Sequence, residues 1–142
     1  MGADIHPWVE VKVDGVWEYR EAPKGLEHRN YTVFGFLTGG VVRPRGYTEY
    51  LPEPRAIRPP NCSEETKNKC NNVASDWGNH SFSWLTLTEL LAVDYMQLVE
   101  DGFRVEHVPL GTAIGPRFMG VLDELKAMGA PEDVRIIFYF DS

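Results

Sequence analysis

The sequence predicts an α+β fold, with a mostly antiparallel sheet, about three helices packed on one of its faces, and long irregular loops. Two observations predict the sheet. Residues 4–13 alternate between apolar and polar side chains, and residues 134–140 (VRIIFYF) are apolar on both faces. Segments with helical spacing or helix-capping residues predict the helices, and sheet and helices together give the α+β class.

The first strand places Ile5, Val9 and Val11 on one face and polar residues on the other. Asp14-Gly15 predicts a two-residue hairpin turn, because both residue types tolerate positive φ. Residues 16–20 then return as the second strand. The strand at 134–140 is expected in the interior of the sheet, beside this hairpin.

Four segments are expected to be helical. Asn30 and Ser63 precede two of them, the motif Thr86-x-x-Glu89 is a capping box for the third, and Pro116 begins the fourth. The expected ranges are 31–38, 63–70, 87 to a stop at Gly102, and 116–129. Residues 41–61, which are rich in proline, and 71–84 are expected to be loops, and 103–108 a strand.

The chain has 142 residues, which fits a single domain over 1–142, and a formal net charge of −7. That charge repels phosphate backbones and argues against long nucleic acid as a partner. No apolar run is long enough to span a membrane, so we expect a cytoplasmic protein in which Cys62 and Cys70 are reduced.

A first candidate site is the polar face of the first strand. Asp4, His6 and Glu10 project to one side, and His80 offers a second imidazole. Carboxylates and imidazoles can hold a divalent metal, or a carboxylate can orient an imidazole as a general base. The alternative is a solvated polar face, which is the usual arrangement in antiparallel strands.

A second candidate site lies in residues 76–84, just before a predicted helix N-terminus. The segment supplies an imidazole, two hydroxyls and two indoles; the candidate ligand-binding residues are Trp77, His80, Ser81, Ser83 and Trp84. Indoles can stack on a base, and helix N-termini attract anions. The alternative is a loop that buried tryptophans hold in place.

A third candidate site is the proline-rich loop, which carries an excess of positive charge in an acidic protein. Its candidate ligand-binding residues are Arg43, Arg45, Tyr47, Arg55 and Arg58. Arginine binds phosphate through a two-pronged fork and tyrosine offers a stacking face, a pairing that suits a nucleotide. The alternative is a solvated loop whose arginines pair with surface acids.

Four blocks of sequence are distributed along the whole chain. They are MGADIHxxVE at the start, RNYxxF at 29–34, HSxSWLTLxEL at 80–90, and DVRIxFxFD at 133–141. In these blocks the chain resembles a family of small uncharacterised bacteriophage proteins. The resemblance implies a phage source and supplies no catalytic residues. Ala3 departs from the pattern, because a cysteine is often expected there, and this weakens the case for a thiol at the site.

The favoured hypothesis is a phage accessory protein that binds, and sequesters, a small phosphorylated nucleotide signal of host immunity, with no cofactor. One alternative is a metal-dependent phosphohydrolase, with a divalent ion held by Asp4, His6, Glu10 and His80 and joined by Asp141. Another is a protein-binding inhibitor of a host enzyme. A homo-oligomer is compatible with each of these hypotheses.

Overall fold

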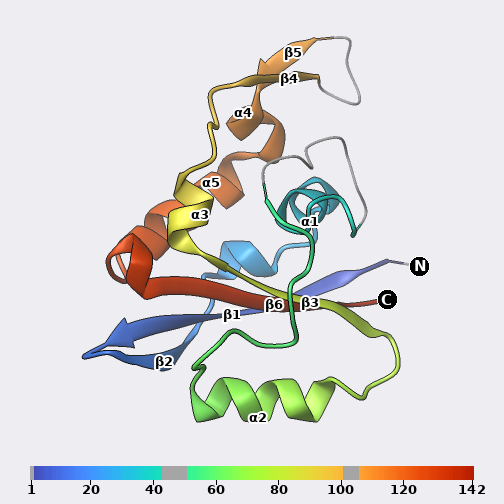
Figure 1. Ribbon diagram of the computed structural model, residues 1–142. Helices are drawn as coiled ribbons and strands as arrows, with labels where there is room; N and C mark the ends of the chain where they lie inside the picture. Colours follow the sequence, from blue (N-terminus) through green and yellow to red (C-terminus); the bar gives the residue numbers. More distant parts are fainter. Residues whose placement is uncertain (1, 43–50, 101–105) are drawn as a thin grey trace.

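A four-stranded antiparallel sheet forms the centre of the computed structural model, which describes residues 2–42, 51–100 and 106–142 (Figure 1). Its strands, in spatial order, are β2 (Val16–Glu21), β1 (Asp4–Val13), β6 (Val134–Asp141) and β3 (Asn79–Thr86). The predicted α+β class, the hairpin and the interior position of the C-terminal strand are confirmed.

The hairpin turn between β1 and β2 has the expected conformation. Asp14 and Gly15 have φ of 50° and 80°, and Val13 pairs with Val16 across the turn. Positive φ at both central residues matches the right-handed twist of the flanking strands. Strand β6 pairs with β1 along the whole length of β6, from Asp4↔Asp141 to Val11↔Val134.

The edge strand β3 was expected to be a loop, and that expectation is wrong for residues 79–84. Asn79 and His80 pair with β6, and the register shifts between His80 and Ser83. This β-bulge breaks the alternation of side chains. The alternation that remains in the sequence, from Ser81 to Trp84, is at the short end of what identifies a strand.

Short helices and a separate pair of antiparallel strands complete the fold (Figure 1). They are η1 (Lys24–Glu27), α1 (Tyr31–Leu37), α2 (Glu64–Val73), α3 (Leu87–Leu91), β4 (Leu98–Glu100), β5 (His107–Pro109), α4 (Leu110–Ile114), α5 (Pro116–Lys126) and η2 (Pro131–Asp133). The Asn30 side chain caps α1, and Thr86 and Glu89 form the predicted capping box of α3.

The third predicted helix is much shorter than its apolar spacing suggested. It ends at Leu91, and the chain then turns and continues as β4. Tyr95 still packs against the core, and its hydroxyl donates to the carbonyl of Leu90 at 2.7 Å. A turn therefore buries the same side chain that a longer helix would have buried.

The helices lie on both faces of the sheet, whereas the sequence suggested one. The helices α1, α3, α4 and α5 cover one face, and α2 alone covers the other (Figure 1). The first face is apolar and includes Val9, Ile136 and Phe138, all buried. Under α2 lies a second, smaller cluster, formed by Trp8, Cys70, Ile137 and Tyr139.

Candidate functional site

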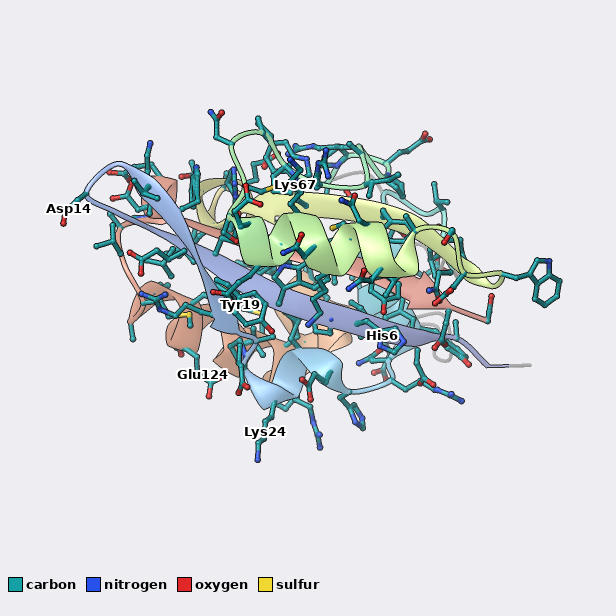
Figure 2. All side chains as sticks on the ribbon, turned by 90° about the horizontal axis from the view of Figure 1, so that it is seen from below. His6, Asp14, Tyr19, Lys24, Lys67 and Glu124 are labelled. Atoms are coloured by element: carbon teal, nitrogen blue, oxygen red, sulfur yellow. The ribbon has the colours of Figure 1, made fainter. Side chains whose placement is uncertain are left out.

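A polar cleft of about 310 Å³ opens on the α2 side of the sheet, where the start of β1 meets η1 and α2. It is lined by Ile5, His6, Pro7, Glu27, Lys69 and Tyr139. We call it the His6 cleft. His6 lies beside α2 and near η1 (Figure 2). The volume falls within the usual range for small-molecule sites, and several polar groups converge on it.

His6 is held in place by its neighbours on the adjoining strand. Its Nε2 lies 2.8 Å from Asp141 Oδ2, and its ring stacks on Tyr139 with centroids 4.8 Å apart. Because β1 and β6 pair in register, one face of the sheet brings all three side chains together. No described residue bonds the other ring nitrogen, Nδ1, and the His6 side chain is 40% exposed. A carboxylate thus orients a solvent-accessible imidazole, as a general base requires.

Tyr139 forms the centre of an aromatic stack beneath the cleft. Its ring is parallel to that of Phe82 at 5.0 Å, and it meets Trp8 edge-on at 6.4 Å. Burial raises the pKa of Tyr139, and the nearby Asp141 carboxylate raises it further. The phenol therefore stays protonated at neutral pH and can donate a hydrogen bond.

Lys69 and Glu27 bring opposite charges to the cleft from α2 and η1. The Lys69 ammonium lies 5.0 Å from the Trp8 ring centroid and donates to the Tyr19 hydroxyl at 3.2 Å. An ammonium has three donors, so this bond leaves others free. Within the described part of the chain, neither Lys69 nor Glu27 forms an ion pair. The cleft therefore offers a cation and a carboxylate to a ligand.

Asp4, one of the predicted metal ligands, is paired with a cation instead. Its Oδ1 accepts from Arg29 Nε at 2.8 Å. The hydrogen bond from the Arg29 guanidinium holds the pKa of Asp4 below its usual range. Asp4 is thus an ionised surface carboxylate at neutral pH.

Glu10 lies in the interior, under α2, and is fully buried. Arg135 donates to its Oε1 from Nε at 3.0 Å and from Nη2 at 2.7 Å, and the Ser63 N–H donates to Oε2 at 2.8 Å. The strand alternation was predicted correctly, but this part of the polar face is not solvated. Helix α2 covers it, whereas the sequence predicts helices on only one face of the sheet.

The predicted metal set of Asp4, His6, Glu10 and His80 is therefore not assembled. Each of the four has another partner, and no three metal-ligating side chains among the described residues are placed to hold an ion. Asp141, by contrast, lies beside His6 as anticipated. The first candidate site survives as an imidazole–carboxylate pair.

Three of the predicted nucleotide-binding residues form one structural cluster. The Arg55 guanidinium stacks on the Trp84 ring at 4.6 Å and pairs with Glu89, while the backbone N–H of Arg55 donates to Ser83 Oγ. The Trp84 ring is also 6.0 Å from Arg135, which in turn stacks on Trp17 at 3.8 Å. Arginines and tryptophans thus alternate across the sheet, and Arg55 is already occupied by a carboxylate.

His80 and Ser81 occupy the other face of the sheet from His6. His80 lies opposite Phe140 in the strand register, whereas His6 lies opposite Tyr139. Consecutive residues of β6 point to opposite faces, so the two imidazoles do not share a site. The C-terminal residues nevertheless bind both, because Asp141 contacts His6 and Ser142 contacts His80.

The remaining predicted ligand-binding residues are scattered or lie outside the described residues. Trp77 is 98% exposed in the turn before β3, and Arg58 Nη1 donates to Asn71 at 3.1 Å on the surface. Arg43, Arg45 and Tyr47 lie outside the described residues. The structure therefore assembles part of the predicted set in the Arg55–Trp84 cluster and part at His80.

Lys69, Glu27 and Tyr139 are not among the site residues that the sequence predicts. Tyr139 carried a usable signal, because it and Asp141 are two residues apart on a strand that was expected beside the first. Lys69 and Glu27 carried none, since they belong to a helix and a turn whose packing on the sheet depends on long-range contacts.

A larger cavity of about 540 Å³ lies between α3 and α5. Its lining is mainly apolar and includes Leu91, Tyr95 and Met119. Its two charged residues, Asp123 and Lys126, bond to each other at 3.4 Å. Both of its charged residues thus belong to an ion pair, whereas Lys69 and Glu27 of the His6 cleft form none among the described residues.

Neither cysteine forms a disulfide. The Cys70 thiol is buried and donates to the carbonyl of Ile57 at 3.2 Å. Burial raises its pKa to about 11, with a further contribution from Cys62. The expectation of two free thiols is confirmed, and Cys70 is too protonated at neutral pH to be a reactive nucleophile.

Within the described ranges, no helix is both long and apolar enough to cross a membrane. No family model matches the sequence, and no curated protein or solved structure is significantly similar to the chain.

Proposed function

We propose that the His6 cleft binds a small phosphorylated nucleotide. The proposal rests on one observation: the cleft holds an oriented imidazole together with an ammonium, Lys69, and a carboxylate, Glu27, neither of which forms an ion pair among the described residues. A ligand that satisfies all three groups must carry both negative charge and hydrogen-bond donors. A nucleotide has both, in its phosphate and in its ribose hydroxyls.

Each lining residue has a role in this proposal. Lys69 binds the phosphate through charge-assisted hydrogen bonds, and His6 adds a second donor, Nδ1–H, when the imidazole carries both ring protons. Glu27 accepts from ribose hydroxyls, as acidic residues do in other nucleotide sites. One face of the His6 ring rests on Tyr139, and the other face offers a base a surface for stacking.

The charge of the whole chain favours a small ligand over a polymer. A net charge of −7 opposes the approach of a long phosphate backbone, whereas a mononucleotide needs only local positive charge. For a phage-encoded protein, as the resemblance implies, the proposed role is the capture of a host immune nucleotide.

Calorimetric titration tests the proposal, with AMP, ADP-ribose and a cyclic dinucleotide as ligands. We expect heat for at least one, and a loss of affinity of roughly 10- to 100-fold in Lys69→Gln, since hydrogen bonds to charged groups contribute about 1.5–3 kcal/mol. Lys67→Gln, on the exposed surface of the same helix, is the matched control and should bind normally. Absence of heat for every ligand, or equal weakening by both variants, would contradict the proposal.

A second candidate function, hydrolysis of the same nucleotide, is favoured by the His6–Asp141 pair. An imidazole oriented by a carboxylate at 2.8 Å can activate water without a metal. Chromatography after incubation separates the two functions. Recovery of intact nucleotide supports capture, whereas products that persist in EDTA and disappear in His6→Gln support hydrolysis.

A further inference from the structure

Ser81 has a backbone conformation that serine rarely adopts. Its φ is +56°, and the other described non-glycine residues with positive φ are Asp14 and Asn61. Asp and Asn tolerate this region because their side chains bond locally, but serine gains less from it. Such strained residues cluster at active sites, where the surrounding structure holds them in place.

The strain coincides with the bulge in β3. The register shift between His80 and Ser83 removes Ser81 from regular pairing with β6. Bulges re-aim a side chain and are over-represented beside active sites. Ser81 as a whole is half-buried.

The Ser81 hydroxyl is paired with an imidazole that is itself oriented by a third group. His80 Nδ1 lies 2.9 Å from Ser81 Oγ, and His80 Nε2 lies 2.9 Å from Ser142 Oγ. If Nε2 carries the ring proton and donates to Ser142, Nδ1 is free to accept the proton of Ser81. The ring also stacks against Phe140 at 6.3 Å, which restricts its rotation.

We propose that Ser81 is a nucleophile activated by His80, at an acyl-transfer site that takes activated esters. Nucleophile, base and orienting group are within hydrogen-bond distance in the order that nucleophilic serine chemistry requires. The site is separate from the His6 cleft, since the two imidazoles lie on opposite faces of the sheet. The inference therefore does not depend on the proposed nucleotide binding.

The proposed step balances without a cofactor. Ser81 Oγ forms a bond to the ester carbonyl carbon while its proton passes to His80 Nδ1. The bond between that carbon and the leaving oxygen then breaks, and the alcohol departs with the proton from His80. Water repeats the sequence on the acyl-serine, releasing the acid and restoring both side chains.

Labelling with an alkyl fluorophosphonate tests the inference. Ser81 Oγ attacks phosphorus, fluoride leaves, and His80 takes the proton, so intact-mass and peptide analysis report the reaction without a known substrate. We expect one adduct, on Ser81, forming at least 100-fold faster than any on Ser75, an exposed serine in the turn after α2. Ser81→Ala should abolish it, and Ser75→Ala should leave it unchanged.

The role of His80 needs a measurement that a merely structural residue would not affect. His80→Gly should slow labelling at least 100-fold, which is the lower range of general-base catalysis, and added imidazole should restore it. His28→Gln, at an exposed histidine, should have no effect. No adduct on Ser81, or labelling that is independent of His80, or a loss that imidazole fails to rescue, would overturn the inference.

Discussion

The two faces of the sheet are built from different chemistry. The face under α1, α3, α4 and α5 is apolar, and Ile5, Val9 and Phe138 are buried there against other hydrocarbon side chains. The face under α2 buries an ion pair, Glu10 with Arg135, and a hydrogen bond from Trp8 Nε1 to Thr66 Oγ1 at 2.9 Å. The interior under the first face is thus stabilised mainly by apolar burial, whereas the interior under α2 also contains buried polar groups that are paired with one another.

The polar face also carries the proposed ligand site. Lys69 and Tyr139 reach the His6 cleft from the same layer that buries Glu10 and Arg135. A buried ion pair tolerates few alternative arrangements, because each partner needs the other. We infer that this layer fixes the position of α2 on the sheet, and thereby the position of Lys69 over β1.

A substitution on the apolar face should change the free energy of unfolding most. Phe138→Ala should lower the free energy of unfolding by about 3–5 kcal/mol, because it removes a fully buried ring and leaves a cavity. Urea unfolding followed by circular dichroism measures the change. A loss below about 1 kcal/mol would contradict the claim that apolar burial on this face is a main source of stability.

The second-largest change in the free energy of unfolding is expected at the buried ion pair of Glu10 and Arg135. Glu10→Gln should destabilise the protein by about 3 kcal/mol, because it leaves the Arg135 charge buried without its partner. The double variant Glu10→Met with Arg135→Leu should recover most of that loss. If the double variant is as unstable as the single one, uncompensated charge is not the cause.

The same pair predicts an acid dependence of stability. Burial acts to raise the pKa of Glu10, but hydrogen bonds from Ser63, Thr66 and Arg135 outweigh it and hold the pKa below its ordinary value of 4.5. A carboxyl with a depressed folded pKa stabilises the fold above its unfolded pKa, and that contribution disappears as the pH falls through the folded pKa. Urea unfolding at pH 7 and pH 3 should therefore show a smaller acid-induced loss in Glu10→Gln than in the native chain.

A smaller effect is expected at the edge of the polar face. Arg55→Gln should cost about 0.5–1 kcal/mol, since it removes a partly exposed stack on Trp84 and an ion pair with Glu89. Arg55→Lys keeps the charge and should retain part of the stability. A neutral result for Arg55→Gln would show that the alternating arginines and tryptophans do not stabilise this edge.

The smallest effect is expected outside both faces. Trp77→Ala should change the free energy of unfolding by less than about 0.5 kcal/mol, because the indole is 98% exposed. Thermal unfolding provides the measurement. A larger destabilisation would indicate that Trp77 packs against the protein in solution.

Local signals in the sequence predicted local structure well. The alternation in β1, the Asp14-Gly15 turn and the Asn30 cap depend on residues a few positions apart, and all three are present. The bulge at Ser81 concealed β3 in the sequence pattern. The helical spacing of apolar residues after Leu91 predicted a helix longer than α3. In both cases long-range packing decided the structure.

The candidate site was predictable only in part, for the same reason. His6 and Asp141 could be placed together because both lie on strands whose pairing was expected. Glu10 could not be assigned correctly, because nothing near it in sequence shows that Arg135 and α2 enclose it. Lys69 and Glu27 reach the cleft only through the packing of their helices.

Nuclear magnetic resonance titration of the labelled protein with AMP or ADP-ribose locates the ligand, and so it tests whether a nucleotide binds in the His6 cleft. We expect the largest chemical-shift changes at the residues that line this cleft: Ile5, His6, Glu27, Lys69 and Tyr139. Shifts confined to Leu91, Tyr95 and Met119 around the larger cavity, or to the segment from Trp77 to Trp84, would contradict this expectation.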